Sequence, residues 1–184
     1  MKTVRSIRGL AFAGVAALGL IAMTPAMADS DFVQGGGTIS ANADLDFRVN
    51  VPRFIDFRVG SAGNTVDTVT FNVAAANVGD GSAVSAGAPI EVALRSNAGN
   101  LTLAANSATA GLTATGLDPI AWSEIVANSS NGNLPVPTVG GSVNLSAANG
   151  VINRTADWSF DYSNSALVGA GTYEGTVTYT ASTP

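Results

Sequence analysis

Residues 38–60 read TISANADLDFRVNVPRFIDFRVG and hold the clearest strand pattern in the chain. From Ile39 to Val51 the odd positions are all apolar, and the even positions between them are all polar or charged. A period of two is typical of a strand with one buried face and one face in water. The pattern therefore predicts a long strand whose inward residues are Ile39, Ala41, Ala43, Leu45, Phe47, Val49 and Val51.

The same alternation resumes directly after Pro52-Arg53, where Ile55, Phe57 and Val59 are expected to point inward. Proline has no N–H to donate to a strand ladder, so Pro52 marks a bend, a bulge or an edge position. Two arrangements follow from this. Either one long strand bends at Pro52, or two strands meet there in a tight turn.

Shorter alternating segments, separated by turns rich in Gly and Asn, fill most of the remaining chain. The dipeptide Asn149-Gly150 and the turn Asn97–Asn100 each predict a hairpin, and Asn-Gly favours positive φ at both positions. A single helical turn is expected at Ser123–Ala127. Together the segments predict an all-β, antiparallel, immunoglobulin-like β-sandwich of roughly eight to ten strands. Beyond the first stretch, the expected strands are residues 66–73, 90–94, 101–103, 143–145, 151–162 and 173–181.

The N-terminus has the features of a signal peptide. Three basic residues precede the apolar run 9–23, and Ala26-Met27-Ala28 matches a small-residue cleavage site. The alternative is a membrane anchor, but the run is short for a full span. We therefore expect residues 1–28 to be cleaved, residues 29–37 to be a flexible leader, and residues 38–184 to form one sandwich domain. The product would be exported to the periplasm, the cell surface or the medium, with no integral membrane segment.

Composition excludes several classes of function. The chain has no cysteine and no histidine, and residues 29–184 contain five arginines and no lysine against thirteen acidic residues. Nucleic acids and anionic lipids require a basic face, so neither is an expected partner. Without histidine or cysteine, the common nucleophile and general-base arrangements are missing. We expect no enzyme activity and no catalytic or cofactor-binding residues.

Without histidine, cysteine or lysine in residues 29–184, covalent catalysis would have to use Ser, Thr, Tyr or a carboxylate. Asp44/Asp46 and Asp157/Asp161 stand at alternate strand positions on a predicted wet face, where solvation is the simplest role. A glycosidase-like pair would need a pocket and a raised pKa. Calcium takes oxygen ligands from Asp- and Asn-rich loops, but no stretch matches the twelve-residue calcium loop. We therefore predict no metal or other cofactor and keep calcium as the one candidate ion.

The aromatic residues allow two interpretations. They either stack sugars on an exposed platform or, as alternate strand positions more often indicate, belong to the core. The residues concerned are Trp122, Trp158, Tyr162, Tyr173 and Tyr179.

The closing stretch Gly169–Thr180, GAGTYEGTVTYT, resembles the last strand of chaperone–usher pilin subunits and of spore-coat-U-like proteins. It is also similar to the end of WxL-type cell-wall-binding domains, although the Trp-x-Leu signature is missing. The pilin resemblance implies an incomplete immunoglobulin-like fold that a strand from a neighbour completes. In that case Tyr173, Val177 and Tyr179 would lie on an edge strand. The disulfide of many pilins is absent.

The stretch Ile39–Val51 has the pattern that an assembly strand needs, and it equally resembles an integral core strand. Our first hypothesis is an exported, non-enzymatic structural or surface protein. It would be a subunit of an extracellular filament or matrix, assembling through strand edges with itself or with another envelope protein. The alternative is a monomeric carbohydrate- or surface-binding module that uses loops 74–88 and 128–137.

Overall fold

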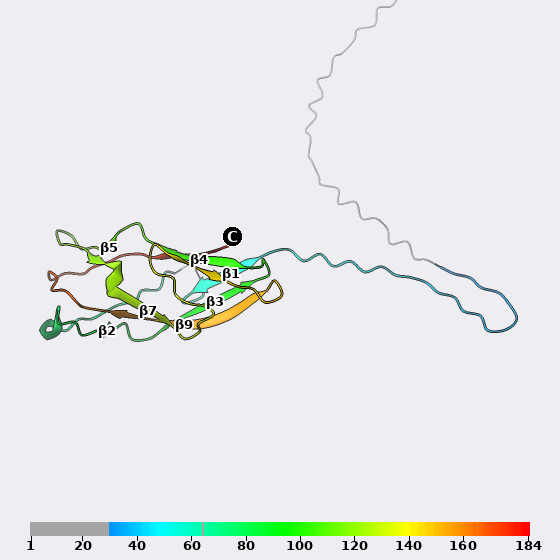
Figure 1. The fold of residues 1–184 in the computed structure, drawn as a ribbon, viewed down its shortest axis with the longest axis horizontal. Helices are drawn as coiled ribbons and strands as arrows, with labels where there is room; N and C mark the ends of the chain where they lie inside the picture. Colours follow the sequence, from blue (N-terminus) through cyan, green and yellow to red (C-terminus); the bar gives the residue numbers. More distant parts are fainter. Residues whose placement is uncertain (1–29, 64) are drawn as a thin grey trace, which may run out of the picture. The chain divides into compact units, whose positions relative to one another are not determined.

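The computed structural model describes residues 30–63 and 65–184 (Figure 1). The chain divides into two units, residues 1–50 and residues 51–184. The second unit contains ten strands, all of whose pairings are antiparallel, and two short 3-10 helices, η1 (Ala75–Asn77) and η2 (Trp122–Glu124). The predicted all-β antiparallel class is confirmed. The predicted signal peptide, residues 1–28, lies outside the described residues.

The larger sheet is built around β9 (Ile152–Tyr162). One edge of β9 pairs with β3 (Ile90–Ser96) and then with β2 (Val84–Ser85), and the other edge pairs with β7 (Ile125–Ser129). On its far side β3 pairs with β1 (Ile55–Val59), which is therefore an edge strand.

The smaller sheet has the order β10 (Thr178–Ser182), β4 (Leu101–Asn106), β8 (Ser142–Leu145). A separate pair joins β5 (Gly111–Leu112) to β6 (Ile120–Ala121). The edge strands β1 and β10 contact each other, so they lie on the same flank of the sandwich. On the opposite flank, the segment 130–141 joins β7 to β8.

The core is formed by inward residues of both sheets. Trp158 is fully buried, packs edge-on against Tyr179 at 5.0 Å between ring centroids, and donates its indole N–H to the Leu134 carbonyl at 3.1 Å. Leu134 is itself fully buried, so the segment 130–141 closes the flank opposite β1 and β10. The remaining buried members of this cluster are Val92, Leu94, Leu101, Leu103, Leu145, Ile152 and Ala156.

Both turns predicted as hairpins carry the chain between sheets instead. Asn97–Asn100 links β3 in the larger sheet to β4 in the smaller one. Asn149 and Gly150 do have positive φ, 52° and 78°, but only one bridge, Ala148 to Val151, forms beside them. The sequence pattern identifies such turns correctly but cannot tell a hairpin from a crossing, since both need the same backbone reversal.

The two ends of the sandwich are defined by these and other turns. At the first end, here the root end, the Gly99 N–H donates to the Gly150 carbonyl at 3.1 Å, and Val51 enters the sandwich close by. At the opposite end, the far end, the buried Asn164 side chain accepts from the Gly79 N–H at 2.9 Å. Strand β9 runs from the root end to the far end, over roughly 35 Å at the usual rise per residue.

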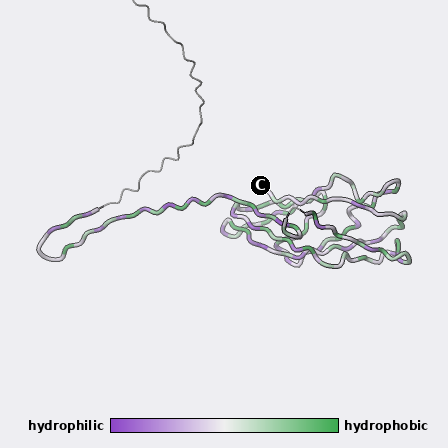
Figure 2. The backbone as a smooth tube through the Cα atoms, turned by 180° about the vertical axis from the view of Figure 1, so that it is seen from behind, coloured by the Kyte–Doolittle hydropathy of each residue, from purple (hydrophilic) through white to green (hydrophobic). Residues whose placement is uncertain are grey.

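The strand predicted for Ile39–Val51 is not formed. Residues 30–54 contain no strand, and residues 30–56 are all exposed, with Phe47 at 87 % and Val49 at 84 %. Figure 2 shows the apolar and polar residues alternating along this stretch. The expectation of a core strand is therefore wrong for the single chain, because its backbone groups pair with no other described strand. We call residues 38–51 the arm. Neither arrangement proposed around Pro52 occurs, since only β1 forms.

Of two other predicted strands, one is not formed and one is shorter than expected. Residues 66–73 are not a strand, although Val69, Phe71 and Val73 are half-buried and Thr68, Thr70 and Asn72 are exposed, as the alternation predicts. The last strand is confined to Thr178–Ser182, so Tyr173 and Val177 precede it. The helical turn expected at Ser123–Ala127 is only partly correct, because η2 covers Trp122–Glu124 and residues 125–127 belong to strand β7.

Candidate functional site

A groove of about 880 Å³ opens between the two sheets, within residues 57–179. Protein interiors are normally close-packed, with few voids larger than one water molecule. A groove of this size therefore means that the sandwich of the single chain is incompletely filled. Its lining is mostly apolar and includes one charged residue, Asp67. The apolar lining side chains are Phe57, Val59, Val66, Val69, Phe71, Ile90, Leu112, Trp122, Ile125, Ala127, Val136, Pro137, Val139, Phe160, Val177 and Tyr179.

The groove extends from the level of Phe57 over the far half of the sandwich. Three of its lining residues, Ile90, Ala127 and Ile125, are opposite Trp158, Phe160 and Tyr162 in the strand register. These positions belong to the second half of β9. Phe71 extends the lining to the last residue of β9, with its ring 6.3 Å from that of Tyr162.

Two segments that line the groove have unpaired backbones. Residues 65–73 make no backbone hydrogen bond to any other described residue, and neither do residues 175–177. Just before the second segment, Glu174 exchanges two backbone hydrogen bonds with Thr113, at 2.8 and 2.9 Å. Unpaired N–H and C=O groups beside an apolar groove are a ready template for an added strand.

A glycine gives the groove its shape near the far end. A Cβ on Gly175 would lie 2.9 Å from the Trp122 indole and 3.2 Å from Leu112, closer than real side chains normally approach. Trp122 is held from the other side, because its indole N–H donates to the Thr109 carbonyl at 2.9 Å. Trp122 is therefore a fixed groove wall, a role that composition and periodicity do not reveal.

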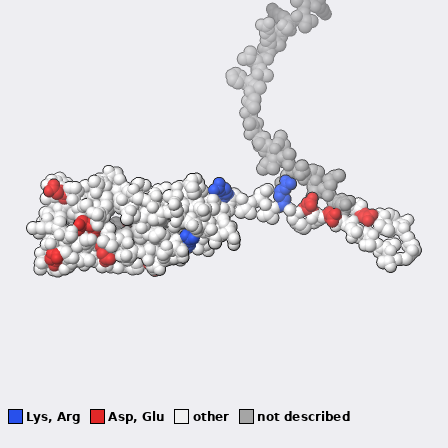
Figure 3. All heavy atoms as spheres, viewed as in Figure 1, with Lys and Arg blue, Asp and Glu red and all other residues white. Residues whose placement is uncertain are grey.

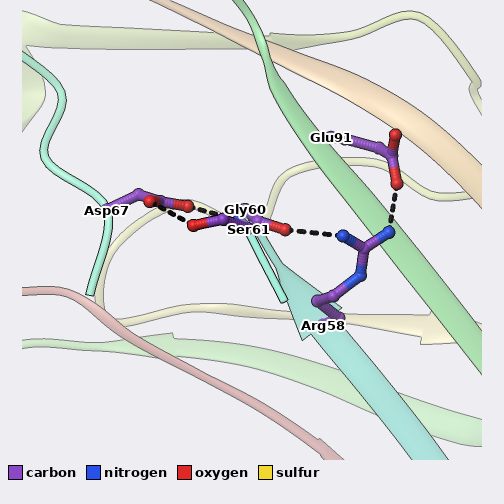
Figure 4. A network of polar contacts seen from close by, with 5 residues as sticks. All are labelled: Arg58, Gly60, Ser61, Asp67 and Glu91. Carbon is purple, nitrogen blue, oxygen red and sulfur yellow. Dashed lines mark hydrogen bonds and ion pairs between the residues drawn. The ribbon is translucent and has the colours of Figure 1, made fainter. Parts of the chain in front are cut away.

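A polar network lies beside the groove (Figure 4). Arg58 pairs with Glu91 and donates to the Gly60 carbonyl, while Asp67 accepts from the backbone N–H of Ser61 and, at 2.6 Å, from its hydroxyl. Gly60 has φ 83°, and a Cβ there would overlap the Asp67 carboxylate. Since Asp67 begins the groove wall 65–73, the network fixes where that wall starts.

The hydrogen bonds from Ser61 hold the pKa of Asp67 below its ordinary value of 3.8. Their stabilising effect is therefore present above the ordinary pKa and lost as the pH falls through the lowered pKa. We expect the Ser61→Ala substitution to move the pKa of Asp67 back toward 3.8. Carbon-detected NMR titration of the carboxylate checks this, and an unchanged pKa in Ser61→Ala would contradict the assignment.

The base of the arm is clamped at the root end. Asn97 accepts from the Phe54 N–H and donates to the Pro52 carbonyl, both at 2.8 Å. Arg53 donates to the Ala98 carbonyl at 2.8 Å, and the buried Ser96 hydroxyl donates to the Phe54 carbonyl at 2.9 Å. These contacts hold residues 52–54 in an extended path that leads straight into β1.

The predicted assembly residues fall in two places. Ile39, Ala41, Ala43, Leu45, Phe47, Val49 and Val51 are exposed along the arm, and no site is formed among them. Val177 and Tyr179 line the groove, and burial raises the pKa of Tyr179 above its ordinary value of 10.0. Tyr173 lies outside the groove lining and donates its hydroxyl to the Gly169 carbonyl at 2.9 Å.

Other candidate chemistry finds little support in the described residues. They contain no group of three or more His, Cys, Asp or Glu side chains placed to hold a metal ion. Asp44 and Asp46 are exposed. Asp157 and Asp161 occupy outward positions of β9, whereas the neighbouring Ala156, Trp158 and Tyr162 are buried. Trp158 belongs to the core, which is one of the two interpretations given above for the aromatic residues. Within the described part of the chain, no helix has the length and apolarity that a membrane crossing requires.

Comparison of the chain with family models, with curated proteins and with solved structures finds no match. The fold itself is an antiparallel β-sandwich with an apolar groove between its two sheets. The features of the chain that bear on function are therefore this groove and the exposed, alternating arm.

Proposed function

We propose that the protein is an exported, non-enzymatic structural subunit that assembles by strand donation. The arm of one copy fills the groove of the next, and repetition builds an extracellular filament or matrix. The observation that carries the proposal is the coexistence, in one chain, of an incompletely filled sandwich and an exposed strand pattern with no partner.

The arm and the groove are complementary in chemistry. Leu45, Phe47, Val49 and Val51 are between 60 % and 87 % exposed, and the groove offers mostly apolar walls. Burying each such side chain contributes about 1.5–3 kcal/mol. The backbone of a donated strand would also find the unpaired groups of residues 65–73 and 175–177. The outward even positions, among them Asp44 and Asp46, would stay in water.

A second copy is the favoured donor because of the clamp. Pro52 and Phe54 are bonded to Asn97 directly before β1, and Val51, the last apolar position of the arm, is the neighbour of this clamp. For the chain to fill its own groove it would have to reverse at Val51 without any linker. A neighbouring copy needs no such reversal.

The test uses the mature chain, residues 29–184, and two matched substitutions. Phe47→Asp places a charge at an inward arm position, and Asn50→Asp adds the same charge at an outward one. We expect the unsubstituted chain and Asn50→Asp to form a concentration-dependent ladder of oligomers. We expect Phe47→Asp to weaken association about 100-fold or more, because it loses apolar burial and would bury a carboxylate. Light scattering after size exclusion and negative-stain microscopy provide the measurement.

A synthetic peptide of residues 38–51 completes the test. It should block assembly when added in excess and should change the fluorescence of Trp122, which lines the groove, in a Trp158→Phe background. Equal assembly of Phe47→Asp and Asn50→Asp would refute strand donation. A chain that stays monomeric at high concentration and does not bind the peptide would favour the binding-module alternative. Glycan arrays would then be the next measurement.

A further inference from the structure

We infer that successive subunits also dock end to end, with the arginine-bearing root end of one copy against the carboxylate-bearing far end of the next. This inference rests on the proposed strand donation and adds a second, electrostatic contact to it. It defines the interaction surface as two opposite ends of the sandwich, and the partner as a second copy of this chain.

The absence of a spacer brings the two ends together. The arm ends at Val51, and the clamp begins at Pro52, whose carbonyl is bonded to Asn97. When the last apolar residue of the arm enters a neighbouring groove, the root end of the donor must therefore touch the mouth of that groove. The groove lies over the far half of the acceptor, so the far end is the surface that the donor meets.

The direction of the donated strand follows from the same geometry. Val51 stays near the far end of the acceptor, so the strand runs from the root end toward the far end in the direction 39 to 51. The segment 172–182 runs the opposite way, since Thr178 pairs with Asn106 and Ser182 pairs with Thr102 near the root end. The donated strand is thus antiparallel to the closing segment, the arrangement that its unpaired edge can accept.

Charge is distributed unequally between the two ends. Arg53 and Arg95 are exposed at the root end, where the exposed Asp56 stands opposite Arg95 in the strand register; among the described residues neither arginine has a carboxylate within ion-pair distance. The far end carries Asp80, Asp118 and Glu124 in its loops and at η2 and has no arginine. On the face shown in Figure 3, blue atoms lie at one end of the sandwich and red atoms at the other.

The carboxylates are tied to the far end by the fold. Asp80 accepts from the Ser82 N–H at 2.8 Å, and Glu124 accepts from the Ser165 hydroxyl at 2.6 Å. Asp118 lies next to Leu117, whose side chain packs against Gly169 and Gly171 in the loop after β9. Opposite charges on the two surfaces that strand donation brings together accelerate encounter and fix orientation more than they add affinity.

The experiment measures assembly of the mature chain at low and high salt, together with charge substitutions. Arg95→Glu and Asp118→Arg should each slow elongation about tenfold at low salt, and high salt should slow the unsubstituted chain similarly. The double substitution Arg95→Glu with Asp118→Arg restores complementary ends at unchanged net charge, so its rate should return to that of the unsubstituted chain. Thr155→Glu, on the exposed face of β9, changes net charge away from both ends and should have no effect.

Binding of the 38–51 peptide separates this inference from the proposed function. Salt-sensitive association that the double substitution rescues supports docked ends, even if the peptide fails to bind and strand donation is wrong. Peptide binding combined with assembly that is insensitive to salt and to Arg95→Glu would leave strand donation intact and overturn the end-to-end contact. No self-association at low salt, or a closed dimer as the final product, would also overturn it.

Discussion

Moving the arm from the N-terminus to the C-terminus is expected to turn the subunit into a stable monomer. In this variant residues 29–50 are deleted from the N-terminus, and the sequence of residues 38–51 is placed after Pro184 through a short flexible linker. The chain ends at the root end after β10, so the relocated arm would run back toward the far end, antiparallel to residues 172–182. It would therefore enter the groove in the same direction as a donated strand.

The expected gain is large, because the relocated strand fills a groove of about 880 Å³ and pairs two open edges. A net gain of only about 3 kcal/mol would raise the thermal midpoint of a domain of this size by roughly 6–12 °C. Calorimetry and light scattering check stability and mass together. The control is the same relocation carrying Phe47→Asp, which should remain monomeric but gain little stability. A relocated chain no more stable than this control would contradict the filling of the groove.

Replacing Trp158 with alanine is expected to give the largest loss of stability from a single substitution. Trp158 is fully buried, packs on Tyr179 and donates to the Leu134 carbonyl. Truncating a buried tryptophan costs about 3–5 kcal/mol, since the lost contacts and the cavity both count. Chemical denaturation followed by circular dichroism measures the free energy of unfolding.

The second tryptophan is a natural control for the first. Trp122 is half-buried in the groove wall, so Trp122→Ala should lower stability less than Trp158→Ala while weakening binding of the 38–51 peptide more. Trp158→Phe keeps a ring in the core and provides a milder variant if Trp158→Ala does not fold. A larger loss of stability at Trp122 than at Trp158 would mean that the core is misassigned.

Alternation of apolar and polar residues located most strands but not their pairing. Period two finds β1, β3, β9 and β10, because each has one face against the core. It cannot say which strand lies beside which, since pairing depends on contacts distant in sequence. The two turns after β3 and β8 illustrate this, for both carry the chain to the other sheet.

The arm is the clearest case in which pattern and structure diverge. Its alternation is as regular as that of any buried strand, yet all seven odd positions from Ile39 to Val51 are exposed. A sequence pattern records what a segment can pair with, and it carries no information on whether the partner is in the same chain. The groove was not predictable either, because its walls come from segments distant in sequence, and a local pattern does not show how such segments pack.

The position of the arm and of the groove on one chain also determines how growth would stop. Under the proposed strand donation, each added subunit would consume one free groove and supply another, so a chain of subunits would always present a reactive terminus. Length would then be controlled by supply, or by a terminator that has a filled groove or no arm. Hydrogen bonds with Asn97 hold Pro52 and Phe54, the residues that directly follow the arm, on the sandwich. Under the proposed strand donation, the described residues would therefore supply a propagation step and no means of stopping it.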